Sequence, residues 1–302
     1  MTTASGPATD VSTNGYVGGF AEGAVLLERR GPVAWVRMNM AGKRNAMSEA
    51  LVQGLARAID AVEADPGFRV MVITGSGPAF SAGGDLALFQ RLVGSGTLDT
   101  FDTYLERGRA LFTRIEQFRR PVIAAVNGVT VAGGLELMLT ADLVYAAESA
   151  RIGDGHVKFG VMPGGGSTAR LSRRLPFNVA SELLLTGRLA DPRELAAHGL
   201  VNAVLADDAL ETHVQQVAET IARHSADGIA RIKALHARAR DRSLDDALAT
   251  EVRALLDYAR GPDLLEGLTA FVEKRAPRFT QAATPGNGLM PDDVSAAGRR
   301  SS

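Results

Sequence analysis

The feature that most constrains the fold is a strand, a glycine-rich turn and a helix that occur twice in the same order. The apolar run "RVMVIT" (69–74) leads to "FSAGGDLALF" (80–89), and "PVIAAV" (121–126) leads to "VAGGLELM" (131–138). Each apolar run is typical of a buried central strand. Each glycine pair brings backbone without side-chain bulk to the start of a helix, where the first N–H groups lack intrahelical partners. The pattern predicts a mixed α/β fold in which two main-chain amides hold one oxyanion.

Other interpretations of the glycines remain open or fit less well. Glycines after strands also serve as ordinary turn residues, and either segment alone fits that interpretation. The stretch "GSGPAF" (75–80) begins like a dinucleotide fingerprint, but Phe80 stands where the third glycine is required. "GGSTA" (165–169) lacks the final glycine of a nucleophile elbow. That absence disfavours a serine hydrolase that uses Ser167 with His156.

The rest of the chain predicts a folded body between two polar tails. Two apolar runs (24–28 and 33–39) indicate a hairpin, and Ser48 is a candidate N-cap for the helix that follows. From Ser167 onward the apolar spacing is almost wholly helical. We therefore expect disordered tails at 1–22 and 280–302, an α/β core at 23–177 and a helical C-terminal region at 178–279.

Composition excludes several classes of function. The 302 residues include no cysteine, so neither a disulfide framework nor a thiolate metal or redox site is available. A formal net charge of −1 disfavours a nucleic-acid-binding surface. No apolar run approaches the roughly 18 residues of a membrane-spanning helix, and the N-terminal stretch lacks the apolar core of an export signal. We expect a cytoplasmic protein without nucleic-acid or membrane partners.

Three motifs in this order and spacing resemble the enoyl-CoA hydratase/isomerase (crotonase) superfamily. They are "AFSAGGDLALF" (79–89), "NGVTVAGGLELMLTADLVYAAESARIG" (127–153) and "GVMPGGGSTARL" (160–171). The resemblance covers residues 24 to 279. It implies a spiral of ββα units followed by a helical C-terminal region that builds trimers, often paired into hexamers. It also implies an acyl-CoA thioester substrate whose enolate is stabilised in the site.

The resemblance assigns roles to particular residues. The amides of Gly84 and Gly133 match the oxyanion donors, and Glu136 matches the first of two catalytic glutamates. The loop that carries Gly84 is implied to line the CoA groove through Ala82, Gly84, Asp85, Leu86 and Ala87. Lys43 and Arg44 are available for the CoA phosphates, although they also fit a solvated loop.

The second catalytic glutamate is absent. Its matching position, four residues before Gly160, is His156. An imidazole can replace a carboxylate as a general acid or base near neutral pH, and Asp154 could orient it. A histidine that only makes loop hydrogen bonds, and an aspartate that only caps the loop, are the structural alternatives.

The resemblance implies an enoyl-CoA hydratase-like lyase without a metal or redox cofactor. Water would add to the 2,3-double bond of an enoyl-CoA, with Glu136 activating the water and His156 assisting proton transfer. The alternatives are a double-bond isomerase or decarboxylase of the same superfamily, and an acyl-CoA-binding protein that has lost the chemistry.

Overall fold

The computed structural model describes residues 15–96 and 98–280, and the chain divides into two compact units after Ala222. The sequence led us to expect a boundary between residues 177 and 178. The division lies later because the helix α8 (Leu210–Ala222) buries Leu210, Val214 and Ala218 in the apolar core of the first unit.

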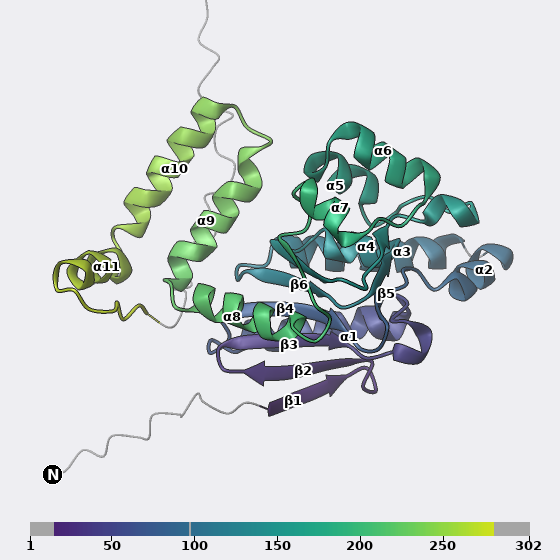
Figure 1. Ribbon diagram of the computed structural model, residues 1–302, viewed down its shortest axis with the longest axis horizontal. Coiled ribbons are helices and arrows are strands. Elements are labelled where there is room, and N and C mark those ends of the chain that lie inside the picture. Colours follow the sequence, from purple (N-terminus) through teal and green to yellow (C-terminus); the bar gives the residue numbers. More distant parts are fainter. Residues whose placement is uncertain (1–14, 97, 281–302) are drawn as a thin grey trace, which may run out of the picture. The chain divides into compact units, whose positions relative to one another are not determined.

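The first unit contains a seven-stranded sheet (Figure 1). Its order is β1-β2-β3-β4-β6-β8-β10; β1, β2 and β3 pair antiparallel, and β3, β4, β6, β8 and β10 pair parallel. The strands are β1 (Gly15–Phe20), β2 (Val25–Arg30), β3 (Val33–Met38), β4 (Val70–Gly75), β6 (Val122–Val126), β8 (Leu143–Ala147) and β10 (Ala203–Leu205). The predicted hairpin and both predicted central strands are confirmed.

A second, small sheet consists of β5 (Ala79–Ser81), β7 (Val129–Val131) and β9 (Ile152–Gly153), all parallel. Each of these short strands directly follows a strand of the large sheet: β5 follows β4, β7 follows β6 and β9 follows β8. Three times in succession, the chain therefore forms a strand of the large sheet and then a strand of the small sheet. The predicted spiral of strand, strand and helix is confirmed, and it brings the segments after β5, β7 and β9 to one edge of the small sheet.

The remaining elements of the first unit are helical and connect these strands. They are η1 (Ala41–Lys43), α1 (Glu49–Ala64), α2 (Leu86–Gly94), α3 (Leu98–Glu116), α4 (Gly133–Met138), η2 (His156–Phe159), α5 (Ser167–Arg174), α6 (Phe177–Thr186) and α7 (Pro192–Ala197). The predicted cap of α1 is present, because the Ser48 hydroxyl accepts a hydrogen bond from the Leu51 amide at 3.3 Å.

Both faces of the large sheet are buried. Along β3, Ala34 and Val36 belong to the apolar cluster that also contains the buried face of α1. Val33 and Trp35 belong instead to the cluster that contains α8. The alternation follows from the opposite directions of successive side chains in a strand. Burial of each large apolar side chain contributes about 1.5–3 kcal/mol, so both clusters fix the strands whose ends carry the loops of the site.

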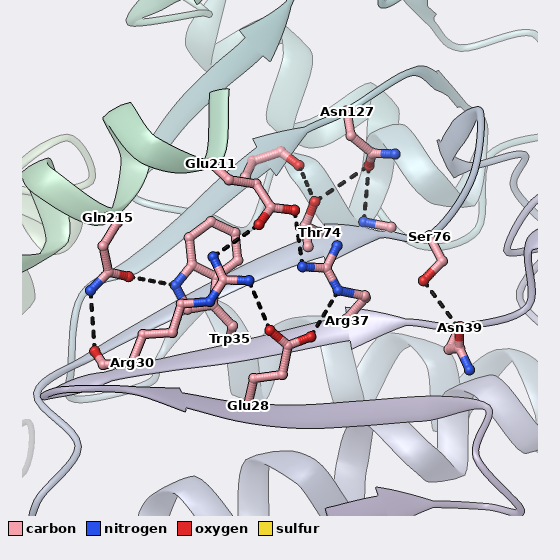
Figure 2. Close-up of polar contacts among 12 residues, drawn as sticks. Glu28, Arg30, Trp35, Arg37, Asn39, Thr74, Ser76, Asn127, Glu211 and Gln215 are labelled. Atoms are coloured by element: carbon pink, nitrogen blue, oxygen red, sulfur yellow. Dashed lines mark hydrogen bonds and ion pairs between the residues drawn. The ribbon is translucent and has the colours of Figure 1, made fainter. Parts of the chain in front are cut away.

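A polar network attaches α8 to the strands it covers (Figure 2). The Trp35 indole donates to the Gln215 side-chain oxygen at 2.7 Å, and the Arg37 guanidinium bonds Glu28 at 3.0 Å and Glu211 at 2.9 Å. Burial disfavours the charged form of Arg37, but its bonds and attraction to both glutamates outweigh this and raise its pKa. The network gives α8 a fixed register on β2 and β3.

The second unit is helical, as the sequence predicted. It contains α9 (Ala226–Ala239), α10 (Leu244–Tyr258) and α11 (Pro262–Val272). Ser225 caps α9 by accepting from the Gly228 amide at 3.1 Å, and its hydroxyl donates to the buried Asp263 at 2.5 Å. Asp263 also accepts from the Thr280 hydroxyl at 2.7 Å, which attaches the last described residue to α11.

The expected tails are only partly covered by the structure. Residues 1–14 and 281–302 lie outside the described residues. Residues 15–20 form β1, so the expectation of a disordered tail is wrong there. Their Gly-rich sequence has weak intrinsic strand preference, and the strand forms because its backbone pairs with β2. Among the described residues, no helix is both long and apolar enough to cross a membrane.

Candidate active site

The structure brings together the two amides that were predicted to form an oxyanion hole. An ideal Cβ placed on Gly133 would lie only 3.5 Å from the Gly84 nitrogen. Neither the Gly84 amide nor the Gly133 amide donates a hydrogen bond to any group in the described part of the chain. Two adjacent N–H groups without partners can bind one oxygen that develops negative charge.

Close backbone packing explains the glycines that neighbour these donors. A Cβ on Gly134 would lie 2.3 Å from the Ser81 carbonyl oxygen, and a Cβ on Gly83 would lie 2.7 Å from the Val131 carbonyl oxygen. Both distances are far below ordinary van der Waals contact, so no side chain is possible at either position. The glycine pairs therefore serve two purposes: one glycine of each pair lets the loops touch, and the other presents its amide.

The residue before the second donor has an unusual backbone conformation. Ala132 has φ 51° and ψ −120°, values that non-glycine residues rarely adopt. Its amide donates to the carbonyl oxygen of Asp154 at 2.8 Å, which holds the strained turn in place. Such strain costs on the order of 1–3 kcal/mol and persists where the surrounding structure enforces it. Here the turn directs the chain into α4, so that Gly133 is its first residue.

The loop before α1 holds the Gly84 loop from the other side. The Met47 amide donates to the Gly83 carbonyl at 2.7 Å, and the Ala82 amide donates to the Arg44 carbonyl at 2.8 Å. The Asn45 side chain is fully buried and donates to the Ala79 carbonyl at 2.8 Å. These bonds place Arg44 next to the first oxyanion loop.

The residues predicted to contact CoA lie around this junction. Lys43 and Arg44 are both exposed. Asp85 is the N-cap of α2 and accepts from the Leu88 amide at 3.0 Å, so it has a structural role in the loop. Leu86 and Ala87 are exposed, and Ala82 is half-buried. Of the residues predicted to contact CoA, four side chains are therefore exposed, and the loop of Arg44 is bonded to the loop of Gly84 through Ala82.

Glu136 is buried, with only 4% of its surface exposed, one turn into α4. Its Oε1 accepts hydrogen bonds from the Gly165 amide at 2.8 Å and from the Ser167 amide at 3.2 Å. These two donors were not predicted, although the glycine run "GGG" before α5 repeats the pattern that identified the oxyanion loops. The bonds occupy Oε1 and fix the carboxylate, and they leave Oε2 as the oxygen available for chemistry.

His156 lies at the start of η2 and pairs with Asp154. The His156 Nδ1 is 3.0 Å from both carboxylate oxygens of Asp154, which is 1% exposed, while the His156 side chain is 10% exposed. Burial lowers the pKa of His156, but the hydrogen bond and charge of Asp154, with the charge of Glu136, outweigh burial and raise it. Glu136 is thus one of two carboxylates whose negative charge raises the pKa of His156.

The arrangement disfavours the hydrolase interpretation of Ser167. The Ser167 hydroxyl is fully buried and has no hydrogen-bond partner among the described residues. His156 directs Nδ1 to Asp154. No group of three acidic or histidine side chains within residues 15–96 and 98–280 has an arrangement that could hold a metal ion.

Aromatic side chains from α2 and α3 lie beside the Gly84 loop. Phe89 packs edge-on against Phe101 and Tyr104, with ring centroids 5.0 and 5.7 Å apart. A Cβ on Gly84 would lie 3.0 Å from the Phe89 ring. The Tyr104 hydroxyl donates to the carbonyl oxygen of Met47. Phe89, Phe101 and Tyr104 thus form an aromatic cluster beside the Gly84 loop. The sequence did not predict this cluster, because it depends on the packing of α2 against α3.

Comparisons with known proteins agree with this geometry. A sequence model of the family described as enoyl-CoA hydratase/isomerase matches residues 28–282. The chain is 33% identical over 255 residues to 2,3-dehydroadipyl-CoA hydratase of Escherichia coli (strain K12), covering 84% of this chain and 98% of that protein. It is 32% identical over 267 residues to the mitochondrial enoyl-CoA hydratase of Pongo abelii, covering 86% and 90%.

A solved structure extends the agreement to three dimensions. The crystal structure of enoyl-CoA hydratase from Bacillus anthracis superposes with a TM-score of 0.80 at 31% sequence identity, covering 85% of this chain and 99% of that chain. With the family match over most of the sequence and the adjacent backbone amides beside a buried glutamate, the protein is a member of the enoyl-CoA hydratase/isomerase family and an enzyme of the hydratase/isomerase type.

Proposed function

We propose that the enzyme adds water to the 2,3-double bond of a 2-enoyl-CoA thioester. The observation that carries this proposal is the position of Glu136. Its carboxylate is buried and held by two backbone amides, in the helix that begins with the oxyanion donor Gly133. A fixed carboxylate can accept a proton from a water molecule, and the neighbouring amides can stabilise the enolate that results from attack on the double bond.

The proposed reaction begins with binding of the thioester carbonyl oxygen by the amides of Gly84 and Gly133. Water attacks C3 while Glu136 takes one of its protons. A C–O bond forms, the C2–C3 double bond is lost, and its electrons move to the carbonyl oxygen as an enolate. Two preformed donors stabilise this charge without reorganisation, and loss of one such donor typically costs about 10² to 10³ in rate.

His156 completes the addition in this proposal. Its Nε2 donates a proton to C2 as the enolate collapses, so the product gains one water in total. The proton that Glu136 took from water then returns to His156, which restores both groups. The raised pKa of His156 supports its role as donor, because a larger fraction of the imidazole is protonated near neutral pH.

Substrate binding in the proposal uses the surface beside Gly84. Lys43 and Arg44 would contact the CoA phosphates, and Ala82, Gly84, Asp85, Leu86 and Ala87 would line the groove. The proposed chemistry requires no metal or redox cofactor beyond the CoA of the substrate. We further propose that the enzyme acts in the cytoplasm as a homotrimer or hexamer. The apolar residues exposed on α10 and α11, such as Leu256 and Leu265, support the proposed assembly, because they could be buried between subunits.

Turnover of a panel of enoyl-CoA substrates tests the reaction. Short, medium and aromatic 2-enoyl-CoA thioesters should lose the absorbance of the conjugated thioester and gain the mass of one water. A product of unchanged mass with a moved double bond would instead identify an isomerase. Loss of carbon dioxide from a carboxylated acyl-CoA would identify a decarboxylase, and binding without turnover on the whole panel would contradict catalysis.

A further inference from the structure

We infer that Asp154 is a positioning residue of the active site. It joins the proton donor His156 to the strained turn at Ala132 that leads to the oxyanion donor Gly133, called the oxyanion turn below. It also determines which nitrogen His156 presents to the substrate. The inference rests on the proposed hydration, in which His156 supplies the proton to C2. It concerns a residue that does not itself contact the reacting atoms. Its physical basis is that Asp154 makes two separate sets of contacts, one through its side chain and one through its main chain.

The side chain of Asp154 determines the orientation of the imidazole. Both carboxylate oxygens lie 3.0 Å from Nδ1 of His156, and Oδ1 also lies 3.3 Å from the His156 amide. A carboxylate only accepts hydrogen bonds, so Nδ1 must carry a proton in either charge state of the ring. The neutral ring therefore has a bare Nε2, and the charged ring has an Nε2–H that can be donated.

The main chain of Asp154 holds the oxyanion turn. Its carbonyl oxygen accepts from the Ala132 amide at 2.8 Å, and Ala132 is the strained residue directly before the donor Gly133. One residue thus fixes both the group that would supply a proton to C2 and the group that would bind the carbonyl oxygen. Loop capping alone would need only the bond to the His156 amide. It does not account for two contacts to Nδ1 from an almost fully buried carboxylate.

The charges around His156 agree with this arrangement. The groups that act on the imidazole are Asp154 on its own segment and Glu136 from α4. On α6, which packs against η2, the carboxylate of Glu182 is paired with Arg188 at 2.9 Å. The imidazole therefore lies in the field of two carboxylates, which favours the imidazolium that can act as an acid.

The substitution Asp154→Asn separates the two sets of contacts. It retains the main-chain carbonyl that holds Ala132, and it removes the negative charge at Nδ1. An asparagine side chain can also present its NH₂ group to Nδ1, which would place the proton of the neutral ring on Nε2. The substitution therefore changes which nitrogen of the neutral His156 ring carries the proton. The hydrogen bond from the Ala132 amide to the main-chain carbonyl of residue 154 is retained.

The state of His156 can be measured without any substrate. The protein has five histidines, so ¹⁵N-histidine NMR spectra can be assigned by comparison with His156→Gln. In the wild-type protein, the neutral ring should carry its proton on Nδ1 and titrate above the ordinary value of about 6.5. Asp154→Asn should shift this titration to lower pH. A neutral wild-type ring protonated on Nε2 would overturn the inference even if the variant did not fold.

Kinetics provides the second test. His156→Gln should reduce kcat by about 10² to 10⁴, and Asp154→Asn should reduce it by less, because Asp154 acts through His156. The double variant should be no slower than His156→Gln alone, which is the signature of coupled residues. Asp263→Asn, which removes a buried carboxylate in the second unit, is the control. It shows how much the loss of a buried negative charge lowers folding stability in general.

Two further results would contradict the inference. One is a folded Asp154→Asn variant with a wild-type pH profile and an unchanged titration of His156. The other is additive losses of rate in the double variant. If the wild-type enzyme hydrated no substrate at all, the proposed function would fail, whereas the NMR result would still decide the contact between Asp154 and His156.

Discussion

Replacing Gly165 by alanine should displace the buried carboxylate of Glu136. Gly165 lies in the run before α5, and its amide donates to the Glu136 Oε1 at 2.8 Å. An ideal Cβ at this position would lie 2.5 Å from the Glu136 Oε2 and 2.7 Å from a ring carbon of Phe112. Gly165 has no positive φ, so the alanine backbone is acceptable and the conflict comes from the added methyl group alone.

The size of the displacement sets the expected loss of rate. Ordinary van der Waals contact begins near 3.4 Å, so the carboxylate oxygen must move by about 0.9 Å unless Phe112 and the loop yield instead. A misplacement of about 1 Å can cost about 10²-fold in rate. Overpacking of this kind also destabilises a fold by about 1–3 kcal/mol. We therefore expect kcat to fall by about 10²-fold in a variant that remains folded.

The assay compares Gly165→Ala with Gly164→Ala. A Cβ on Gly164 would meet only a methyl group of Leu105, at 3.7 Å, which is ordinary contact. Steady-state kinetics with the best substrate of the panel should give near wild-type kcat for Gly164→Ala, and urea unfolding should show that both variants are folded. Full activity in Gly165→Ala, or an equal loss in both variants, would refute the assignment of the Glu136 carboxylate as the catalytic group fixed by this loop.

Three further predictions concern the same site. Glu136→Gln should lower kcat by about 10² to 10⁴ with little change in affinity for acyl-CoA, measured by kinetics and calorimetry; an unchanged rate would give Glu136 a structural role. Replacing both Lys43 and Arg44 by alanine should weaken binding of a non-reactive acyl-CoA and reduce its salt dependence, because phosphate contacts are screened; equal salt dependence in both proteins would exclude these cations. The pKa of His156 is raised in the folded protein, so its pairing with Asp154 stabilises the fold fully below about pH 6.5 and loses this effect as pH rises through the folded pKa. The stability advantage of wild type over Asp154→Asn in urea unfolding should therefore be larger at pH 6 than at pH 9, and a pH-independent difference would contradict the pairing.

The sequence predicted most of the large sheet, because its strands carry strong local signals. Long apolar runs identified β4 and β6, and Ser48 identified the start of α1. The small sheet gave almost no signal, since β5 and β7 have three residues each and owe their conformation to pairing between distant segments. The later position of the unit boundary has a similar cause: a helical pattern does not reveal that α8 packs on the sheet.

The candidate site could likewise be predicted where its sequence signals are local, and could not be predicted where it depends on contacts between distant residues. The glycine motifs were identified from their repeated pattern of strand, glycine pair and helix, and the family resemblance assigned the roles of Gly84, Gly133 and Glu136. The structure brings Gly84 and Gly133 close together. The hydrogen bonds from Gly165 and Ser167 to Glu136 were missed, because they join residues 29 and 31 positions apart. The conformation of Ala132 also gives no sequence signal, since alanine is not a residue that a left-handed turn favours. It arises from the contact of its amide with Asp154.

The small sheet leads us to expect that the site opens locally before the large sheet does. β5, β7 and β9 contribute two or three residues each, whereas most strands of the large sheet contribute five or six. Free energies of local opening vary within one protein, and segments with few pairing bonds open first. During a gradual rise in urea, the two amides should therefore separate while β3, β4 and β6 are still paired. The enzyme should lose activity at a lower urea concentration than that at which its circular dichroism changes, and inactivation in this first range should reverse rapidly on dilution.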